Sequence, residues 1–378
     1  MRSGTALRVG IQQRVLPAYR TAFFDSLGRS LRGGVSVFAG APRPGEAIGQ
    51  AESLHDARWI RARNFHLGAG GLSALWQGGI REWIAAEDPR LIVLEANPRY
   101  LTNYGLRRRM LAAGRPVIGW SLGPARTAGP LAGWMRSYYG AFSALIAYSR
   151  SGADAFRRLG IPAERIFTAP NAVESRTADR LCGRPRAKQT LRRALGLDSR
   201  PVVLFVGRLQ KRKRVDSLLR ACARSGVPCQ LMIVGDGDDR ARLERAAGEV
   251  FPAARFTGDL RGEELGRCFL AADLFILPGT GGLALQEAML YGKPVAAAEA
   301  DGSQRDLIRE GENGWLLPPG DEDALLGVIR EALSDLRRLE RMGRASRRIV
   351  RETATMDKMV EGFLQAITFA LRTAAEKP

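Results

Sequence analysis

Short apolar runs, each bounded by glycine or polar residues, alternate along the chain with longer stretches whose apolar residues recur at helical spacing. This alternation predicts parallel sheets with crossover helices, and hence an α/β protein. In the first half the predicted strands are Arg8–Gln13, Val35–Gly40, Leu91–Ala96, Pro116–Trp120, Ala144–Ser149 and Arg165–Ala169. In the second half they are Val202–Val206, Gln230–Val234, Leu274–Pro278, Pro294–Ala298 and Gly314–Pro318.

An arginine-rich segment without a strand pattern, Thr177–Arg200, separates the two halves and contains Pro185. We therefore expect two doubly wound, Rossmann-like domains facing a cleft. The first spans 1–178, a linker spans 179–198, and the second domain begins at 199 and ends at 352. Ligands of open parallel sheets bind beyond the carboxyl ends of the strands, so the loops that follow strands should carry the chemistry.

The composition narrows the classes of function. The chain has 378 residues, 45% of them hydrophobic, which is enough for two buried cores. Its four cysteines form no C-x-x-C pair and it has two histidines, which excludes zinc fingers and disulfide scaffolds and predicts no metal site. No stretch approaches the roughly 18 uninterrupted apolar residues of a membrane-spanning helix, and the first residues lack the core of a signal peptide. The sequence thus predicts a soluble or peripheral protein in a reducing compartment.

Positive charge is concentrated in the first half. Lys and Arg number 58 against 39 Asp and Glu, a formal charge of +19, and no acidic residue occurs between Glu95 and Asp154. One interpretation is solvated surface, because arginine enrichment on this scale often reflects coding bias. The other is a face for an anionic partner such as lipid headgroups or a lipid-linked diphosphate, since no nucleic-acid-binding motif accompanies the charge. The arginines of this acid-free stretch are Arg99, Arg107, Arg108, Arg109, Arg115, Arg126, Arg136 and Arg150.

Cations and glycines follow the predicted strands of the second half. Gly207 and Arg208 come directly after one strand, with Lys213 close behind, and Leu274–Pro278 runs into Gly279-Thr280-Gly281-Gly282. Glycines let a backbone approach a ligand, and the amides of a following helix attract anions. We expect a diphosphate site here. Glu287, in that helix, is either a solvent-facing glutamate or an acceptor of ribose hydroxyl hydrogen bonds.

Motifs of the second half resemble a known family and occur in family order. They are VVLFVGRLQKRKRVDSLLRA (Val202–Ala221), LMIVGDGDDRARLE (Leu231–Glu244), RFTGDL (Arg255–Leu260), LGRCFLAADLFILPG (Leu265–Gly279), GLALQEAMLYGKPVAAAEADG (Gly282–Gly302) and GENGWLLPPGD (Gly311–Asp321). The first half agrees more loosely, through VLPAYRTAFFDSL (Val15–Leu27) and ALIAYSRSGADAFRRLGIPAERIF (Ala144–Phe167). The family is that of the retaining nucleotide-sugar glycosyltransferases called family 4 or group 1, which have the two-domain GT-B fold. The resemblance implies a C-terminal helix over 353–378 that crosses back to the first domain.

The resemblance also implies roles for individual residues. Arg208 and Lys213 look like the family's diphosphate-binding pair, and Glu287 looks like the second glutamate of its E-x7-E motif, which binds the nucleotide ribose. The remaining donor-site residues would be Gly281, Gly282, Leu283 and Ala284 at the phosphates, Gly235, Asp236, Gly258 and Leu260 at the base, and Gly207 and Gly279 beside them. The residues expected on the acceptor side are Arg14, Tyr19, Trp120 and Ser121.

The chain departs from the family at two places. Gly279 stands where the E-x7-E motif has its first glutamate, and the loop Gly119-Trp120-Ser121-Leu122-Gly123 lacks a histidine that many members place near the donor. That loop also has the form G-x-S-x-G of a hydrolase nucleophile elbow. The hydrolase fold needs a histidine after the serine, whereas His55 and His66 both precede Ser121, which argues against a serine hydrolase.

We therefore expect a retaining glycosyltransferase that moves a sugar from a UDP- or GDP-sugar to a glycan or lipid-linked acceptor. No other cofactor, no metal and no nucleic acid are expected. An anionic membrane surface is an expected partner, with the protein cytoplasmic or peripheral on the cytoplasmic face of an inner membrane. Two alternatives remain open. Gly279 is consistent with a GT-B relative of altered chemistry, a sugar-nucleotide epimerase or pseudo-glycosyltransferase, and the charge is consistent with a non-catalytic adaptor for membranes or polyanions.

Overall fold

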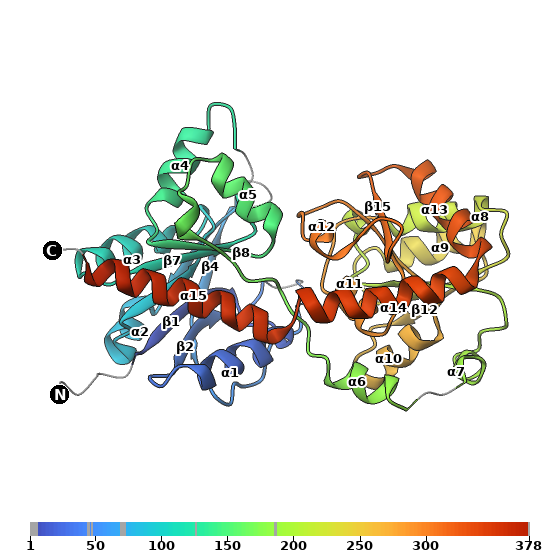
Figure 1. Cartoon of the computed structure of the whole chain (residues 1–378), viewed down its shortest axis with the longest axis horizontal. Coiled ribbons are helices and arrows are strands. Elements are labelled where there is room, and N and C mark those ends of the chain that lie inside the picture. Colours follow the sequence, from blue (N-terminus) through green and yellow to red (C-terminus); the bar gives the residue numbers. More distant parts are fainter. Residues whose placement is uncertain are drawn as a thin grey trace. The chain divides into compact units, whose positions relative to one another are not determined.

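The computed structural model describes residues 7–43, 46, 48–68, 73–124, 127–184 and 187–376 (Figure 1). Arg126 and Pro185 lie outside these described residues. The chain divides into two compact units, one made of Met1–Asn171 and Met356–Pro378 and the other of Ala172–Thr355. The division falls before the expected boundary at 178, because α6 (Arg176–Cys182) and α7 (Lys188–Ala194) pack against α10 (Gly262–Ala271) of the second unit.

A seven-stranded parallel sheet forms the centre of the first unit, in the order β3-β2-β1-β6-β7-β8-β9. Its strands are β1 (Val9–Val15), β2 (Val35–Gly40), β3 (Arg58–Arg61), β6 (Leu91–Glu95), β7 (Val117–Ser121), β8 (Ala144–Ala147) and β9 (Ile166–Thr168). Val9 of β1 lies beside Val35 on one side and Leu91 on the other. The direction of winding therefore changes between β1 and β6, and this first switch point is one of the places where such sheets bind ligands.

Helices cover both faces of the first sheet. On one face Phe363 of α15 (Met356–Ala375) contacts Phe23 of α1 (Thr21–Ser30) and Trp120 of β7, with ring centroids 4.7 and 4.8 Å away. On the other face four helices bury a cluster that includes Trp83, Leu106 and Phe156. They are α2 (Ile80–Glu87), α3 (Leu101–Ala112), α4 (Ala132–Gly140) and α5 (Arg150–Arg158). Among the described residues, the unit also has two 3-10 turns, η1 (Ala18–Arg20) and η3 (Ala163–Arg165).

An antiparallel hairpin of β4 (Arg63–Leu67) and β5 (Ala74–Gly78) forms a separate two-stranded sheet in the first unit. Phe65 and Trp76 are directly paired across it. Both side chains are half exposed, at 52% and 50%. The hairpin thus presents an aromatic pair to solvent instead of burying it in the core.

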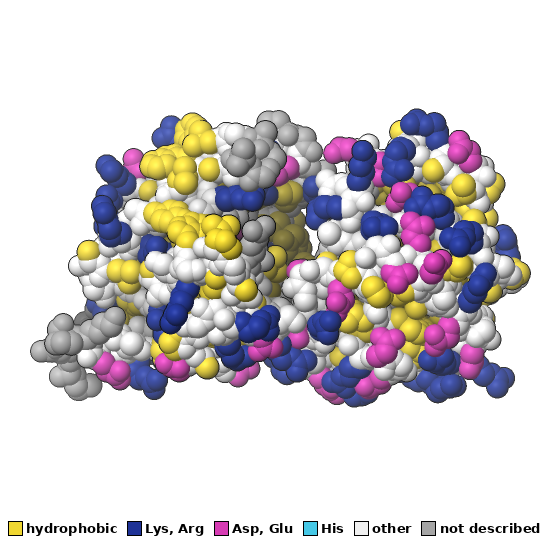
Figure 2. Space-filling model, turned by 90° about the horizontal axis from the view of Figure 1, so that it is seen from above, with side chains coloured by type: hydrophobic (Ala, Val, Ile, Leu, Met, Phe, Trp, Pro, Cys, Tyr) yellow, Lys and Arg dark blue, Asp and Glu magenta, His cyan; other side chains and the backbone are white. Residues whose placement is uncertain are grey.

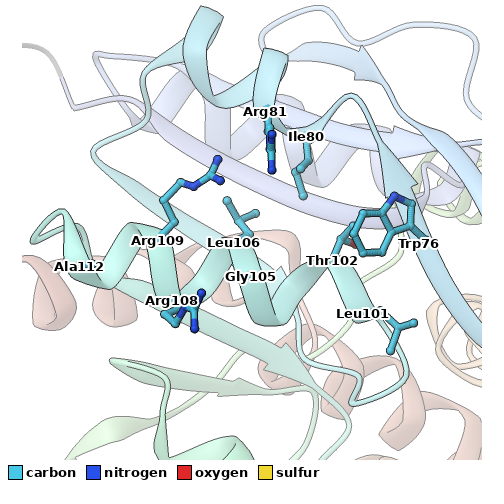
Figure 3. Close-up of a pocket in the computed structure, with 10 residues that line it drawn as sticks. All are labelled: Trp76, Ile80, Arg81, Leu101, Thr102, Gly105, Leu106, Arg108, Arg109 and Ala112. Atoms are coloured by element: carbon cyan, nitrogen blue, oxygen red, sulfur yellow. The ribbon is translucent and has the colours of Figure 1, made fainter.

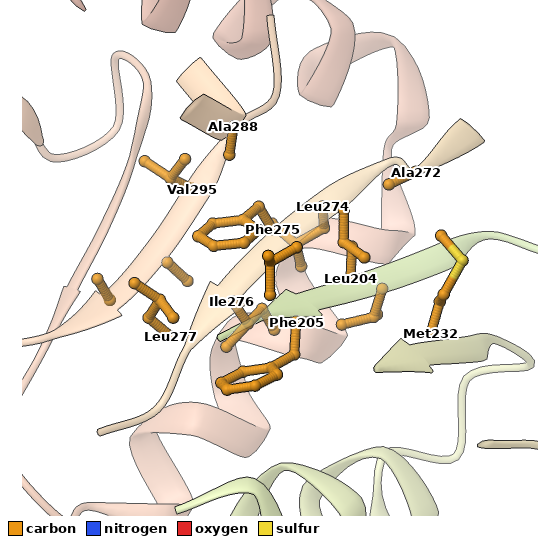
Figure 4. Close-up of a cluster of buried hydrophobic side chains, with 14 of the residues drawn as sticks. Leu204, Phe205, Met232, Ala272, Leu274, Phe275, Ile276, Leu277, Ala288 and Val295 are labelled. Atoms are coloured by element: carbon orange, nitrogen blue, oxygen red, sulfur yellow. The ribbon is translucent and has the colours of Figure 1, made fainter. Parts of the chain in front are cut away.

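The second unit is built on a six-stranded parallel sheet in the order β12-β11-β10-β13-β14-β15. Its strands are β10 (Val202–Val206), β11 (Gln230–Val234), β12 (Ala254–Gly258), β13 (Leu274–Leu277), β14 (Val295–Ala298) and β15 (Gly314–Leu317). The remaining elements are η4 (Lys211–Lys213), α8 (Val215–Arg224), α9 (Arg240–Val250), α11 (Ala284–Leu290), α12 (Gln304–Leu307), α13 (Glu322–Ser334) and α14 (Leu336–Thr353). Phe205 and Phe275, both fully buried, lie at the centre of its core (Figure 4). The second switch point lies between β10 and β13.

Every strand predicted from an apolar run is present, and the expected Rossmann-like α/β class is confirmed. The strands that were not predicted are β3, β4, β5 and β12. β3 and β12 lie at sheet edges, where partial exposure interrupts the apolar run, and the hairpin strands alternate between exposed and more buried residues. A buried parallel strand needs apolar residues on both faces, whereas edge and hairpin strands do not.

The two units differ in surface charge. On the face shown in Figure 2, Lys and Arg of the second unit are interspersed with Asp and Glu, whereas acidic side chains are scarcer on the first unit. Within the described ranges, none of the helices combines the length and the apolar content needed to span a bilayer.

Candidate active site

The second switch point brings together the loops that follow β10 and β13. Val203 of β10 lies beside Leu274 of β13, so the two strands run in register toward the same edge of the sheet. The first loop carries Arg208 and Lys213, and the second carries the residues from Gly279 to Leu283. Two loops predicted from separate motifs are therefore neighbours in the fold.

Lys213 connects these loops directly. Its side chain is buried, and Nζ donates hydrogen bonds to the carbonyl oxygens of Thr280 (2.7 Å) and Gly281 (2.8 Å). Burial, together with the positive charges of Arg212 and Arg208, lowers the pKa of the Lys213 ammonium to about 8. Arg208 is thus close enough to act on Lys213, and the site holds several positive charges together, as an anionic ligand requires.

Gly279 has a steric explanation in this loop. A Cβ at this position would overlap the carbonyl oxygen of Arg212 and come within 2.8 Å of the Lys213 Cα. The neighbouring amide of Thr280 donates to the same Arg212 carbonyl at 3.0 Å. The glutamate that the family motif has here cannot be accommodated without moving the backbone that positions Lys213.

Backbone amides lie beside this cation. Gly282 is exposed, and a Cβ there would be 3.7 Å from the Lys213 Nζ. Gly281 packs on the buried Gln304, whose Nε2 would overlap a Cβ at 281. In the described part of the chain no backbone carbonyl accepts from the amides of Gly281, Gly282, Leu283 or Ala284, and no side chain caps α11. These amides are available to phosphate oxygens.

Glu287, one turn into α11, is largely buried. Burial raises the pKa of its carboxyl to about 7. Among the described residues no hydrogen-bond donor to this carboxylate is found, although Tyr291 is close enough for its own pKa to be raised in part by Glu287. A buried carboxyl without donors is costly to ionise, and ligand hydroxyl groups could supply the missing hydrogen bonds.

Backbone hydrogen bonds and close packing connect the loops that carry the residues expected at the base. The Gly207 amide donates to Val234 (3.0 Å), and the Gly235 amide donates to Gly258 (2.8 Å). Gly235, at φ +134°, packs so tightly against Gly207 that a Cβ would overlap the Gly207 carbonyl oxygen. Leu260 is half-buried against the core.

Asp236 lies in the turn between these glycines. Its carboxylate accepts from the Gly237 amide (2.7 Å) and from Arg240 (3.0 Å), and these bonds lower its pKa. These hydrogen bonds therefore stabilise the turn and keep the Asp236 carboxyl ionised.

The residues expected on the acceptor side lie in the first unit, where Arg14 is the next-to-last residue of β1, at the first switch point. Arg14 forms an ion pair with Glu46 (2.6 Å), and its amide donates to Glu95 at the end of β6 (2.9 Å). Burial opposes the charge of Arg14, but the carboxylates outweigh it and raise its pKa. Tyr100 also donates to Glu95 (3.1 Å), while Tyr19 is exposed. This edge carries matched charges and hydrogen-bonding groups.

Trp120 does not contact solvent, so the expectation that its side chain touches an acceptor is wrong. Its exposed fraction is 0%, because Phe23, Tyr148 and Phe363 surround its ring. The guanidinium of Arg20 lies 4.2 Å above the ring. Trp120 thus supports Arg20 and the core.

Ser121 ends β7 and its Oγ accepts from the Gly123 amide at 3.0 Å. Apart from glycines, the described residues with positive φ are Asp88 and Arg214, so Ser121 is not on the strained turn of a nucleophile elbow. The geometry agrees with the chain order in arguing against a serine hydrolase.

Sequence analysis missed Arg20, Glu46, Glu95 and Gln304. Glu95 could have been found, since it ends the otherwise apolar strand Leu91–Glu95 and polar residues at that point line the ligand edge. No sequence signal marks Glu46 or Arg20, because their importance comes from partners distant along the chain. Arg20, for example, donates to Gln13 (2.8 Å) and Tyr148 (3.1 Å).

Comparison with known proteins shows which proteins this chain is similar to. Residues 187–349 match the family described as glycosyl transferases group 1. A GDP-mannose-dependent alpha-mannosyltransferase of Mycobacterium tuberculosis is 32% identical over 274 residues, which are 70% of this chain and 62% of that protein. A GDP-mannose-dependent alpha-(1-6)-phosphatidylinositol monomannoside mannosyltransferase of Mycolicibacterium smegmatis is 31% identical over 259 residues, which are 64% of this chain and 65% of that protein. The chain therefore spans less than two thirds of the length of either relative.

A solved structure gives the same fold. The crystal structure of Anabaena HepE in complex with UDP aligns with a TM-score of 0.74 at 19% identity, over 96% of this chain and 99% of that one. This similarity confirms the expected GT-B class with its two Rossmann-like domains.

Proposed function

We propose that this chain, whose residues 187–349 match the glycosyl transferases group 1 family, is a glycosyltransferase using a nucleoside-diphosphate sugar. The second unit binds the donor and the first unit binds the acceptor, a glycan or a lipid-linked saccharide. The two mannosyltransferase relatives use GDP-mannose by name, which makes GDP-mannose the first donor to test. We extend the proposal to work at an anionic membrane surface, where a lipid-linked acceptor resides.

The observation that carries the proposal is the setting of Lys213. Its ammonium is held by two carbonyls of the Gly279–Gly282 loop, with Arg208 nearby and free amides beside it. Among the described residues no carboxylate forms an ion pair with Lys213, although Asp301 is close enough to favour its charge, so the ammonium can still pair with a ligand. A diphosphate supplies the anionic oxygens that match both the cations and the amides.

Sugar transfer needs stabilisation of charge on the departing diphosphate. As the bond from the sugar C1 to the diphosphate oxygen breaks, Lys213, Arg208 and the loop amides would stabilise the developing negative charge. Glu287 would accept hydrogen bonds from the ribose and so fix the donor. We propose retention: the acceptor oxygen bonds to C1 on the face that the diphosphate leaves, and its proton passes to a diphosphate oxygen.

The test measures nucleotide binding and transfer with the full chain. GDP, UDP and ADP are titrated, and labelled GDP-mannose is then supplied with and without a lipid extract as acceptor. Lys213→Met should weaken diphosphate binding ten- to over a hundredfold, because a charged hydrogen bond is worth about 1.5–3 kcal/mol. Lys211→Met is the matched control, since this exposed lysine lies on the same turn, and it should change binding by no more than about twofold.

The outcomes separate the alternatives. A labelled glycolipid or glycan supports the proposal, and an epimerised sugar nucleotide formed without acceptor would replace it with the altered-chemistry alternative. Absence of affinity for every nucleoside diphosphate would overturn it in favour of an adaptor. Equal losses in Lys213→Met and Lys211→Met would remove Lys213 from the site.

A further inference from the structure

The residues placed at the donor so far leave the transferred sugar without a charged hydrogen-bond acceptor. Lys213 and Arg208 match a diphosphate, and Glu287 matches a ribose. The family motif has a carboxylate at position 279, but here a Cβ would overlap the carbonyl oxygen of Arg212. An ionised carboxylate accepts several hydrogen bonds from hydroxyl groups, so a donor sugar would gain from such a group on another loop.

A pocket in the first unit does not supply this acceptor. It lies between α2 and α3 and has a volume of about 450 Å³ (Figure 3). The described residues that line it include Arg81, Arg108 and Arg109 and no carboxylate. Guanidinium groups donate hydrogen bonds and accept none, so this pocket has no charged acceptor to offer a sugar.

The loop that connects β14 to α12 lies beside the glycine loop of the second unit. Leu277 of β13 is paired with Ala297 of β14 in a parallel register, and Gly279 and Glu299 each follow two residues later. Parallel strands bring their carboxyl ends to the same edge of the sheet, where ligands bind. The β14–α12 loop, which carries Glu299 and Asp301, thus begins next to the position that lacks its carboxylate.

A buried glutamine connects the two loops. Gln304, the first residue of α12, is 1% exposed. Its Oε1 accepts from the amide of Ala300 at 3.3 Å, and its Nε2 lies 2.3 Å from the position that a Cβ at Gly281 would take. The loop that carries Asp301 is therefore packed against the loop that carries Gly281.

Asp301 has one carboxylate oxygen fixed and the other open. The residue is exposed, and its Oδ1 accepts from the amide (3.0 Å) and the hydroxyl (2.6 Å) of Ser303. Among the described residues no donor to its Oδ2 is found. The charge of Asp301 favours the protonated form of Lys213, so this carboxylate lies near the cation of the diphosphate site. Glu299, by contrast, is already paired with Arg305.

We propose that Asp301 binds hydroxyl groups of the transferred sugar and so performs the role that a carboxylate cannot perform at position 279. Its Oδ2 accepts hydrogen bonds from the sugar, while Ser303 holds the carboxylate in place. This role rests on the proposed function and deepens it, because it names the residue that distinguishes a nucleotide sugar from the bare nucleotide.

Asp301 should have opposite effects on these two ligands. A carboxylate near a diphosphate repels it, so Asp301 disfavours a bare nucleoside diphosphate. With a nucleotide sugar the same carboxylate gains hydrogen bonds from the sugar, and these outweigh the repulsion. Removal of the charge should therefore weaken binding of the nucleotide sugar and should not weaken binding of the nucleotide.

The test is calorimetric titration of the full chain with GDP and with GDP-mannose at pH 7, below the Lys213 pKa of about 8. UDP and UDP-glucose replace them if UDP is the tighter nucleotide. Asp301→Asn keeps an oxygen for the two Ser303 hydrogen bonds, so it removes the charge and preserves the turn. We expect it to bind the nucleotide sugar about tenfold more weakly, and the nucleotide as tightly as the parent or up to about threefold more tightly.

Two control variants isolate the carboxylate. Glu249→Gln removes one negative charge from an exposed position in the last turn of α9 and should leave both affinities within about twofold of the parent. Ser303→Ala removes the hydroxyl that orients Asp301 but keeps the carboxylate, and it should weaken nucleotide-sugar binding by no more than about threefold. Each variant should have the thermal unfolding temperature of the parent.

Deoxy analogues of the donor test the contact itself. In GDP-mannose analogues that lack single sugar hydroxyls, loss of the hydroxyl that Asp301 binds should weaken binding to the parent about tenfold. The same loss should weaken binding to Asp301→Asn less than about twofold, because the effects of two groups in contact are not additive. Equal losses in parent and variant for every analogue would overturn the proposal.

Three further results would also overturn it. Equal weakening of GDP and GDP-mannose binding by Asp301→Asn would mean that Asp301 acts through Lys213. Equal losses in Ser303→Ala and Asp301→Asn would reduce Asp301 to a turn residue, and unchanged GDP-mannose binding would remove it from the donor. In each case the parent still binds GDP, so the proposed function survives. A parent without affinity for any nucleoside diphosphate rejects the proposed function, and this role of Asp301 with it.

Discussion

The two switch points of this protein have the same strand topology but differ in whether their charged side chains are paired within the protein. At the first, Arg14 is neutralised by Glu46 and lies beside Glu95, within a set of mutually hydrogen-bonded side chains. At the second, Lys213 donates to two carbonyls, and its burial together with the neighbouring arginines lowers its pKa to about 8. Charge left unmatched within the protein is charge available to a ligand.

This difference in charge supports the proposal that the second unit binds the donor and the first unit binds the acceptor. A site whose cations are already matched gains little from an anion and is suited to hydroxyl groups, which its carboxylates and amides can bind. The second site, where the described residues give Lys213 no ion pair and the loop amides no carbonyl partner, gains from a diphosphate. The proposed assignment of donor to the second unit and acceptor to the first thus has a basis in the side chains as well as in the match of residues 187–349 to the group 1 family.

The largest change in the second switch point is expected from adding the missing motif glutamate, Gly279→Glu. Its side chain would displace the Arg212–Lys213 backbone and bring a carboxylate next to Lys213, giving the second switch point the matched charge of the first. We expect donor affinity to fall at least a hundredfold, from overpacking of about 1–3 kcal/mol together with the loss of a charged hydrogen bond. Calorimetric titration with GDP measures the effect.

Two glycine-to-alanine variants control for this result. Gly279→Ala should retain part of the loss, since its Cβ makes the same overlap, while Gly248→Ala in α9 has open space around its Cβ and should not weaken binding. If Gly279→Glu bound GDP as well as the parent, the steric account of this position would be wrong.

A smaller effect is expected from removing one arginine at each switch point, Arg208 at the second and Arg14 at the first. Arg208→Ala should lower kcat/KM for the donor ten- to over a hundredfold, through loss of about 1.5–3 kcal/mol at the diphosphate. Arg14→Ala should leave GDP affinity unchanged and raise the KM for the acceptor several-fold, because its loss disturbs Glu46 and Glu95. Steady-state kinetics with each substrate varied in turn separates the two, and a GDP defect in Arg14→Ala would contradict the division of labour.

The smallest expected effect is a pH dependence confined to the second switch point. The donor needs ionised Glu287 and protonated Lys213, whose pKa values are about 7 and about 8. We expect kcat/KM to fall up to tenfold for each pH unit below 7, as Glu287 gains a proton, and to fall similarly above 8, as Lys213 loses one. Glu287→Gln should flatten the acidic side of the profile and leave the alkaline side in place.

The raised pKa of Glu287 also predicts how folding stability depends on pH. The raised pKa of Glu287 means that the folded protein binds a proton more tightly than the unfolded chain, whose glutamate has an ordinary pKa of 4.5. Its contribution to stability is therefore present below 4.5 and is lost as the pH rises toward 7, opposite to the trend for donor binding. Urea unfolding of Glu287→Gln and the parent across this range tests it, and a parent-like slope in the variant would contradict the assignment.

Sequence alone predicted the central strands, because buried parallel strands need unbroken apolar runs. It also marked, by their glycines and cations, the loops that we propose bind the donor. It could not predict why position 279 is glycine, since the Arg212 carbonyl that excludes a side chain belongs to another loop. It misjudged Trp120 for a related reason. A tryptophan at a strand end can face ligand or core, and the choice was made by Phe23 and Phe363 from the two ends of the chain.

The return of α15 to the first sheet sets an order of assembly. A ribosome completes every residue of the second unit before it synthesises Phe363, so Trp120 and Phe23 wait through all of that synthesis for their third aromatic partner. The first unit, whose synthesis begins first, is thus complete only after the whole second unit has been synthesised. During that interval its uncovered apolar face is exposed to chaperones and to aggregation, and α15 closes it once that helix has been synthesised.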